Sequence, residues 1–218
     1  MPWLRRALAW TQLAPALRSG LWGVLLFAGG VWVARHYAQP VQQALEAHAA
    51  AGVLVFVASS ALAVLLPLAS NLPLVPLAVL AWGPWWTASL LLLGWLIGAV
   101  GSFAIARRAG PWLLRRFPSA MRHADIDRLI HPRHRLGSLV ALRMTFPVDV
   151  LSYALGLFSR STTSSEVAIS TLLGAAPFAL LFAWFPTLSA AAQAFVFAAS
   201  TLAFAAHLVW VLRRDLPR

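Results

Sequence analysis

The chain has 218 residues, of which 61% are hydrophobic and only 11% are charged. Globular domains have roughly 45–50% apolar and about 25% charged residues, so this composition excludes an ordinary soluble domain and indicates a polytopic membrane protein. The absence of cysteine excludes disulfides, thiolate metal ligands and a thiol nucleophile. The net charge of +11 comes from 17 basic residues, all of them arginine, against 6 acidic residues.

The first half of the chain is expected to hold three kinds of membrane segment. Residues 1–18 repeat apolar side chains at helical spacing beside arginines, which predicts a cytoplasmic helix lying on the membrane surface. The apolar run 19–38 predicts a first transmembrane helix if its flanking arginines reach the headgroups; a signal-peptide core is the alternative. Residues 49–106 contain no ionisable side chain and exceed the length of one span, which is about 20 residues.

The arginines are grouped in a way that predicts the orientation of the chain. Three lie near the N-terminus, eight between residues 107 and 135, and three near the C-terminus. Short arginine-rich segments stay on the cytoplasmic side. We therefore expect both termini and the loop 107–136 to be cytoplasmic, with no nucleic acid needed to explain the charge.

This orientation requires two segments to begin and end on the same side of the membrane. Helix 19–38 leaves the cytoplasm and a helix at 85–106 returns to it, so residues 51–83 must start and finish outside. Prolines around Asn71 break a helix there, and a re-entrant hairpin satisfies both constraints. The same reasoning predicts a second hairpin at 137–158, entering from the cytoplasmic side. Two spanning helices complete the expected arrangement, at residues 166–185 and 190–212.

The predicted fold is all-α, with about four spanning helices and two opposed re-entrant hairpins related as an inverted repeat. This arrangement is typical of transporters, and a plain helical bundle with proline kinks is the alternative. Thr163 and Glu166 have the spacing of a capping box at a helix start. The spacing of Gly94 and Gly98 predicts close helix packing, either within the chain or in a homo-oligomer.

The second hairpin carries the candidate substrate-binding residues. Arg143 and Asp149 lie where a charge costs about 2.5–3.5 kcal/mol, so they should pair or face a cavity. A guanidinium binds phosphate through a planar set of donors, so Arg143 is expected to hold a headgroup phosphate. Asp149 would pair with Arg143, or take up a proton when phosphate displaces it; a purely structural salt bridge is the alternative.

Two glutamates are candidates for an ion or proton relay. Glu46 lies near the predicted outer mouth of the first hairpin, and a solvated loop residue is the alternative for it. Glu166 has the alternative of a helix cap. No metal site is expected, because the chain has no cysteine and arginines surround His131 and His134.

One run of the second hairpin resembles a known membrane-protein family. The run is Leu-Val-Ala-Leu-Arg143-Met-Thr-Phe-Pro147-Val-Asp149-Val-Leu-Ser-Tyr153-Ala-Leu-Gly156, and it resembles the core element of the DedA/VTT family, also called SNARE-associated Golgi proteins. Further matching positions extend the resemblance to about residues 50–186: Leu72-Pro73, Trp82-Gly83-Pro84, Gly94, Gly98, Ala104-Ile-Ala-Arg107-Arg108-Ala-Gly110 and Leu173-Gly174-Ala-Ala-Pro177.

The resemblance implies two opposed re-entrant hairpins and the movement of lipids between leaflets. Eukaryotic members are associated with phospholipid scrambling, and bacterial members with recycling of undecaprenyl phosphate. The chain departs from the bacterial DedA subgroup, because Asn71 stands where that group has a glutamate and Asp149 where it has a second arginine. It therefore looks closer to the VTT branch. Asn71 of the first hairpin and Pro147, Tyr153 and Gly156 of the second are further candidate substrate-binding residues. For the last three, the alternative is that they shape the bend of the second hairpin.

We expect a transporter or scramblase-like protein of the inner cell membrane that moves an anionic lipid, either a phospholipid or a polyprenyl phosphate. Its expected partners are membrane lipids with anionic headgroups; no enzyme activity, cofactor or nucleic acid is expected. The alternatives are an ion or small-solute transporter that uses the same hairpin site, and a membrane scaffold that acts through the 107–136 loop. The sequence contains no phosphate-cradling loop or hydrolase motif.

Overall fold

The computed structural model describes residues 29–33, 36–37, 39–40, 43, 48–66, 71–116 (without the side chains of 111–116), 126–196 and 198–199. This part of the chain is helical and contains no strand. The predicted surface helix 1–18, much of the predicted helices 19–38 and 190–212, and Glu46 lie outside the described residues.

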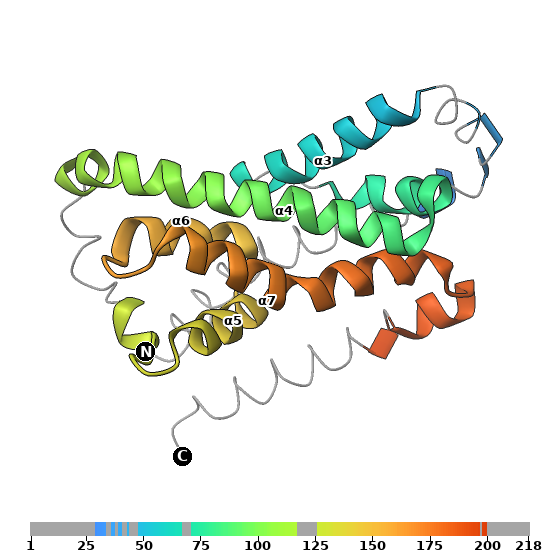
Figure 1. The fold of residues 1–218 in the computed structure, drawn as a ribbon. Coiled ribbons are helices and arrows are strands. Elements are labelled where there is room, and N and C mark those ends of the chain that lie inside the picture. The colour runs from blue at the N-terminus through green and yellow to red at the C-terminus, as the bar shows by residue number, and fades with distance from the viewer. Residues whose placement is uncertain are drawn as a thin grey trace, which may run out of the picture.

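The first described unit is a helical hairpin formed by α3 (Ala49–Leu65) and the start of α4 (Val75–Arg116). The short 3-10 helix η1 (Leu72–Leu74) leads into α4, with proline at its start, where no helical N–H is required. α4 then bends at Gly83, whose φ of 76° lies in a region that glycine adopts without strain. The start of α3 and the bend at Gly83 therefore lie at the same end of the molecule (Figure 1).

Two glycines allow α3 and α4 to touch backbone to backbone. A Cβ added at Gly98 would lie 2.6 Å from the Cβ of Val64, and one added at Gly94 would collide with Ser60. Side-chain atoms do not approach so closely, so glycine is needed at both positions. The expected close contact is thus confirmed within the chain.

The second hairpin consists of α5 (Arg135–Thr145) and α6 (Val148–Phe158). Pro147 is the N-cap of α6 and Phe146 is extended, because a residue before proline is driven out of the helical region. Each helix has 11 residues and is therefore about 16 Å long, roughly half of the ~30 Å hydrocarbon layer of a bilayer.

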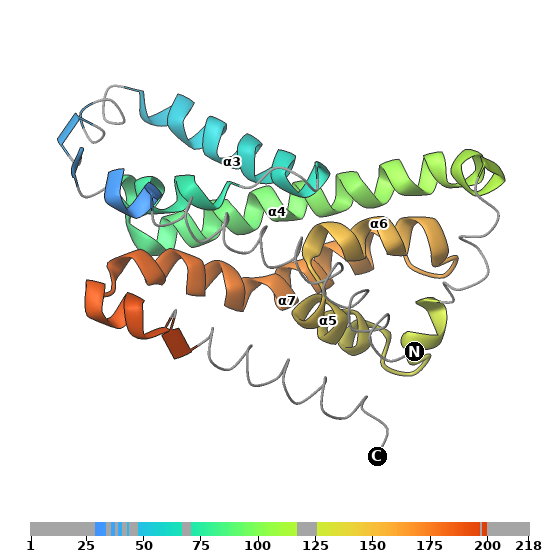
Figure 2. The ribbon, with the colours of Figure 1, turned by 180° about the vertical axis from the view of Figure 1, so that it is seen from behind.

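The two hairpins open toward opposite ends of the long part of α4. Figures 1 and 2 show that the open end of the α5–α6 hairpin is next to the C-terminal end of α4, whereas α3 begins near the bend at Gly83. Gly156 brings α6 against α4, since a Cβ there would lie 2.6 Å from the Cβ of Ala106. The described chain thus doubles back twice, from opposite directions, as the parity of the arginine-rich segments predicts.

The long helix α7 (Ser164–Trp184) runs antiparallel to α4 and packs against both α4 and α5 (Figure 2). Thr163 accepts a hydrogen bond from the N–H of Glu166, and the carboxylate of Glu166 accepts one from the N–H of Thr163. The predicted capping box is therefore confirmed. The 3-10 helix η4 (Phe185–Thr187) follows α7 directly.

Two described helical stretches are long and apolar enough to cross a bilayer, Leu72–Gly110 and Ser164–Thr187. Only 39% of the most apolar window of each is buried inside the protein, whereas a core helix of a soluble protein would be mostly buried. Many large apolar side chains are exposed on these helices, among them Trp85, Trp86, Ile97, Ile105, Leu173 and Leu181. The chain has the outer surface of a membrane protein; four spans and re-entry into the bilayer remain predictions.

One predicted boundary needs correction. α4 continues to Arg116, whereas the sequence analysis placed the end of this helix at residue 106 and a loop from 107. The arginines mark the end of the apolar stretch and not the end of the helix, because arginine and leucine are both strong helix formers.

Candidate functional site

The side chain of Arg143 is buried at the tip of the second hairpin, with 2% of the residue exposed. Its Nη1 donates to the backbone carbonyl of Val148 at 2.7 Å and to the hydroxyl of Ser152 at 2.8 Å. The hydroxyl of Ser152 in turn donates to the same carbonyl. One corner of the guanidinium is therefore fixed to α6.

The rest of the guanidinium is also buried. Of its five N–H donors, those on Nε and Nη2 make no hydrogen bond to any residue that the structure describes. A buried unpaired donor costs about 1–3 kcal/mol, and more when it is charged. Among the described residues, Arg143 is thus a buried cation with two nitrogen atoms that lack an acceptor.

Asp149 is not a partner of Arg143. It lies half-buried in the first turn of α6, and among the described residues no hydrogen bond or ion pair joins it to Arg143. Val148 and Ser152 are one helical turn apart and share a face, whereas Asp149 is rotated by about 100° from Val148. The salt bridge considered from the sequence is replaced by hydrogen bonds to Ser152 and to the Val148 carbonyl.

The two hairpins are joined by a hydrogen bond from Tyr153. Its hydroxyl donates to the backbone carbonyl of Leu65, the last residue of α3, at 2.7 Å. Asn71 is buried, and its amide donates to the hydroxyl of Ser60 within the first hairpin. Tyr153 therefore links the middle of α6 to the end of α3, while the hydrogen bond of Asn71 stays inside its own hairpin.

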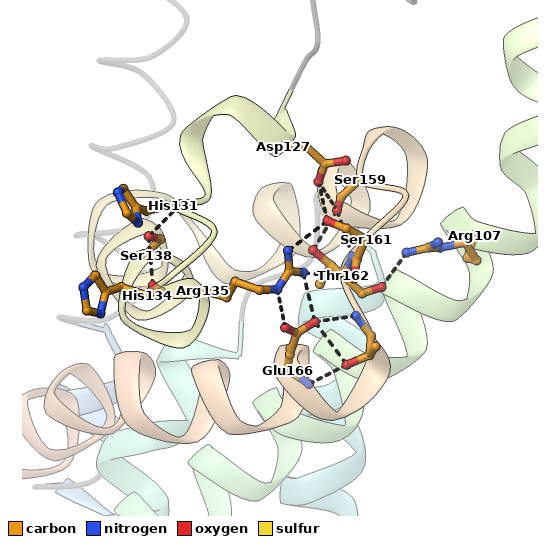
Figure 3. Close-up of polar contacts among 11 residues, drawn as sticks. Arg107, Asp127, His131, His134, Arg135, Ser138, Ser159, Ser161, Thr162 and Glu166 are labelled. Atoms are coloured by element: carbon orange, nitrogen blue, oxygen red, sulfur yellow. Dashed lines mark hydrogen bonds and ion pairs between the residues drawn. The ribbon is translucent and has the colours of Figure 1, made fainter.

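Glu166 lies at the opposite end of α5 from Arg143. Besides capping α7, its carboxylate forms an ion pair with Arg135, with an Nε–Oε1 distance of 2.8 Å (Figure 3). Arg135 also donates to the carbonyl and the hydroxyl of Ser161. The carboxylate of Glu166 is thus engaged by Thr163 and Arg135.

The loop between α6 and α7 is tied to two other elements at this end. Asp127, in the 3-10 helix η3 (Ile126–Leu129), accepts hydrogen bonds from the hydroxyls of Ser159 and Ser161 and from the N–H of Arg160 (Figure 3). Arg107 of α4 donates to the carbonyl of Thr162 at 2.8 Å. These contacts fix the start of α7 relative to α4.

Burial raises the pKa of the Asp127 carboxyl, but the hydrogen bonds from Ser159, Arg160 and Ser161 and the charge of Arg135 outweigh it. The net result is a pKa below the usual aspartate value. The pKa of Arg135 is raised by its hydrogen bond and charge interaction with Glu166. Both groups therefore keep their charges at neutral pH.

The sequence analysis did not identify Ser152, Gly174 or Asp127 as important contacts. A Cβ at Gly174 of α7 would lie 2.5 Å from the Cβ of Arg143, so this glycine allows α5 to sit against α7. The available signals were that Ser152 and Gly174 lie in runs that match the family, and that Asp127 is one of few acids among many arginines. No group of three side chains that could hold a metal ion occurs in the described part of the chain.

The comparisons with known proteins identify the family. The sequence model of the VTT domain matches residues 66–188, which is more than half of the 218-residue chain. No curated protein and no solved structure gives a significant match. The matched region contains η1, α4, both helices of the second hairpin and α7, including Arg143 and its hydrogen-bond partners. The chain therefore belongs to the DedA/VTT family of membrane proteins.

Proposed function

We propose that this protein moves an anionic lipid, a phospholipid or a polyprenyl phosphate, between the leaflets of the inner cell membrane. The observation that carries the proposal is the buried guanidinium of Arg143, whose Nε and Nη2 have no partner among the described residues. A phosphate that crosses a hydrocarbon layer needs a compensating charge, because an isolated buried ion is very costly. Arg143 supplies that charge.

The surroundings of Arg143 favour a lipid over a small soluble anion. Met144, Phe146 and Val150, which flank Arg143 along the hairpin tip, are 52%, 45% and 52% exposed. Exposed apolar side chains beside a buried cation match a molecule with an acyl or polyprenyl chain next to a phosphate.

The geometry of the hairpins supports a position for Arg143 at mid-depth of the bilayer. α5 and α6 are each about 16 Å long, so a hairpin that starts at the cytoplasmic surface would end near the middle of a ~30 Å hydrocarbon layer. In this proposal α3 enters from the outside, and the hydrogen bond from Tyr153 to Leu65 joins the end of α3 to the middle of α6. Four spanning helices and cytoplasmic termini complete the proposed topology.

The function can be tested by measuring leaflet exchange in reconstituted vesicles. Purified protein is incorporated into vesicles with a fluorescent phosphatidylglycerol, and external quencher reports how fast the inner-leaflet probe becomes accessible. We expect Arg143→Ala to slow exchange by about 10- to 100-fold, since a charge-assisted hydrogen bond contributes about 1.5–3 kcal/mol. Arg143→Lys should be intermediate, because lysine keeps the charge and loses the planar set of donors.

Arg108→Ala is the matched control. Arg108 is exposed on α4 and makes no side-chain hydrogen bond to a described residue, so its loss should leave exchange unchanged. Wild-type protein that behaves like an unrelated membrane protein would refute the proposal. A protein that loses its cellular function when arginines 115, 116, 122 and 128 are replaced together, but keeps it with Arg143→Ala, would indicate the scaffold.

The proposed topology can be tested separately, because the native chain has no cysteine. Single cysteines at Gln42 and Thr187 should react with a membrane-impermeant maleimide from outside the cell. A cysteine at Ala120 should react only after the membrane is opened. Labelling of residue 120 in intact cells would overturn the proposed orientation.

A further inference from the structure

We propose that Ser152 is a positioning residue that turns one defined edge of the Arg143 guanidinium toward a ligand with two acidic oxygens. This inference rests on the proposed function and specifies how the same site recognises its substrate. Ser152 is completely buried, and its hydroxyl lies between Nη1 of Arg143 and the carbonyl of Val148.

The direction of the hydrogen bonds fixes the orientation of the guanidinium. The hydroxyl proton of Ser152 is used for the carbonyl of Val148, so its oxygen is left to accept from Nη1 of Arg143. The same carbonyl accepts the second bond from Nη1. Because α6 supplies both acceptors of Nη1, the planar guanidinium cannot rotate without losing these hydrogen bonds.

The base of the arginine is held independently. α5 approaches α7 so closely at Gly174 that a Cβ there would lie 2.5 Å from the Cβ of Arg143 and 3.1 Å from the carbonyl oxygen of Val140. The Cβ of Arg143 is therefore fixed by packing against α7, and its Nη1 by hydrogen bonds to α6. A side chain fixed at both ends has little freedom to adapt to a ligand.

The edge that remains free has a specific chemistry. Nε–H and one N–H of Nη2 point in parallel from the same side of a guanidinium, which matches two oxygens of one phosphate or carboxylate. A ligand with one acceptor, such as an alcohol headgroup, would leave one of these donors unpaired and buried. The site should therefore select an exposed phosphate, in a lipid headgroup or as free phosphate, over a neutral headgroup.

Ligand binding in neutral detergent tests this role without depending on transport. Wild type is titrated with short-chain phosphatidic acid, short-chain diacylglycerol and inorganic phosphate, and dissociation constants are measured by calorimetry. We expect Ser152→Ala to weaken binding of phosphatidic acid by about tenfold. Ser152→Thr should bind within about twofold of wild type, and Ser152→Val, which has the shape of threonine without the hydroxyl, should behave like Ser152→Ala.

Thr145→Ala serves as the matched control. Thr145 is an exposed residue of the same hairpin tip, and its hydroxyl donates only to the carbonyl of Ala141. Its removal should leave binding of phosphatidic acid unchanged. In an Arg143→Lys background, Ser152→Ala should have no further effect on binding, because no Nη1 remains to be held.

Each outcome supports or overturns the inference. Wild-type affinity in Ser152→Ala, or equal affinities for Ser152→Thr and Ser152→Val, would show that the hydroxyl does not position Arg143. An undiminished effect of Ser152→Ala in the Arg143→Lys background would show that Ser152 acts without Arg143. Preferential binding of inorganic phosphate over phosphatidic acid would identify a free anion as the ligand. Intact binding without leaflet exchange would refute the proposed function and leave the positioning role standing.

Discussion

Replacement of Gly174 by alanine should reduce lipid exchange far more than it reduces stability. The added Cβ would lie 2.5 Å from the Cβ of Arg143, about 1–1.5 Å closer than carbon atoms normally approach. Neither atom is the flexible end of a side chain, so α5 and α7 must separate. Arg143 then moves with α5.

The expected magnitudes follow from two opposing terms. Overpacking costs about 1–3 kcal/mol, whereas alanine in place of a helical glycine gains about 0.5–1 kcal/mol. The net destabilisation is about 1 kcal/mol, which lowers the unfolding temperature of a chain of this size by about 2–4 °C. Because a displacement of about 1 Å at a binding group can cost as much as 100-fold, we expect exchange to fall by about tenfold or more.

The assay compares thermal unfolding in detergent with leaflet exchange in vesicles. Gly137→Ala is the control, since Gly137 also lies in a helix, α5, but a Cβ there meets nothing within 4 Å. This variant should be as stable as wild type or slightly more stable, and should exchange lipid normally. If Gly174→Ala matched Gly137→Ala in both measurements, the close contact between α5 and α7 would have no part in placing Arg143.

Three further predictions concern the fixed parts of the molecule. Gly98→Ala should lower the unfolding free energy by about 1–3 kcal/mol, because its Cβ would lie 2.6 Å from that of Val64; a stabilised variant would contradict the packing of α3 on α4. Tyr153→Phe removes the hydrogen bond to Leu65 and should lower the free energy of unfolding by about 0.5–1.5 kcal/mol. An unchanged unfolding temperature would show that this hydrogen bond does not hold α6 against α3. Asp127 has a lowered pKa in the folded state. Its ionised carboxylate therefore contributes fully to stability above the unfolded-state pKa of about 3.9, and this contribution is lost as pH falls through the folded-state pKa. Unfolding measured from about pH 5 down to about pH 2 should therefore show an acid-induced loss of stability that is smaller in Asp127→Asn.

The path of the chain was predictable because charge and proline act over long distances in the sequence. Arginine-rich segments on one side require that the apolar residues 51–83 return to the side from which they started. The structure shows a helical hairpin there, which runs from α3 to the bend of α4 at Gly83, while its return to the same side of a membrane stays a prediction. The spacing of Thr163 and Glu166 likewise predicted the start of α7, because a capping box depends only on local sequence.

The partners of Arg143 were not predictable in the same way. Asp149 and Ser152 are both near Arg143 in the sequence, and opposite charge made Asp149 the natural expectation. Which of them meets the guanidinium depends on the face that α6 turns toward α5, and this is set by packing against α4 at Gly156. Contacts of this kind between helices are not encoded in short spacings.

The anchoring of Arg143 has a consequence for movement. Both groups that hold its Nη1 belong to the same hairpin as the arginine itself. The connection to the first hairpin, by contrast, is a hydrogen bond from Tyr153 to a single carbonyl. A rigid-body shift of the second hairpin would therefore carry the charged group and its orientation along together, and would have to slide along α4 at Gly156 and along α7 at Gly174.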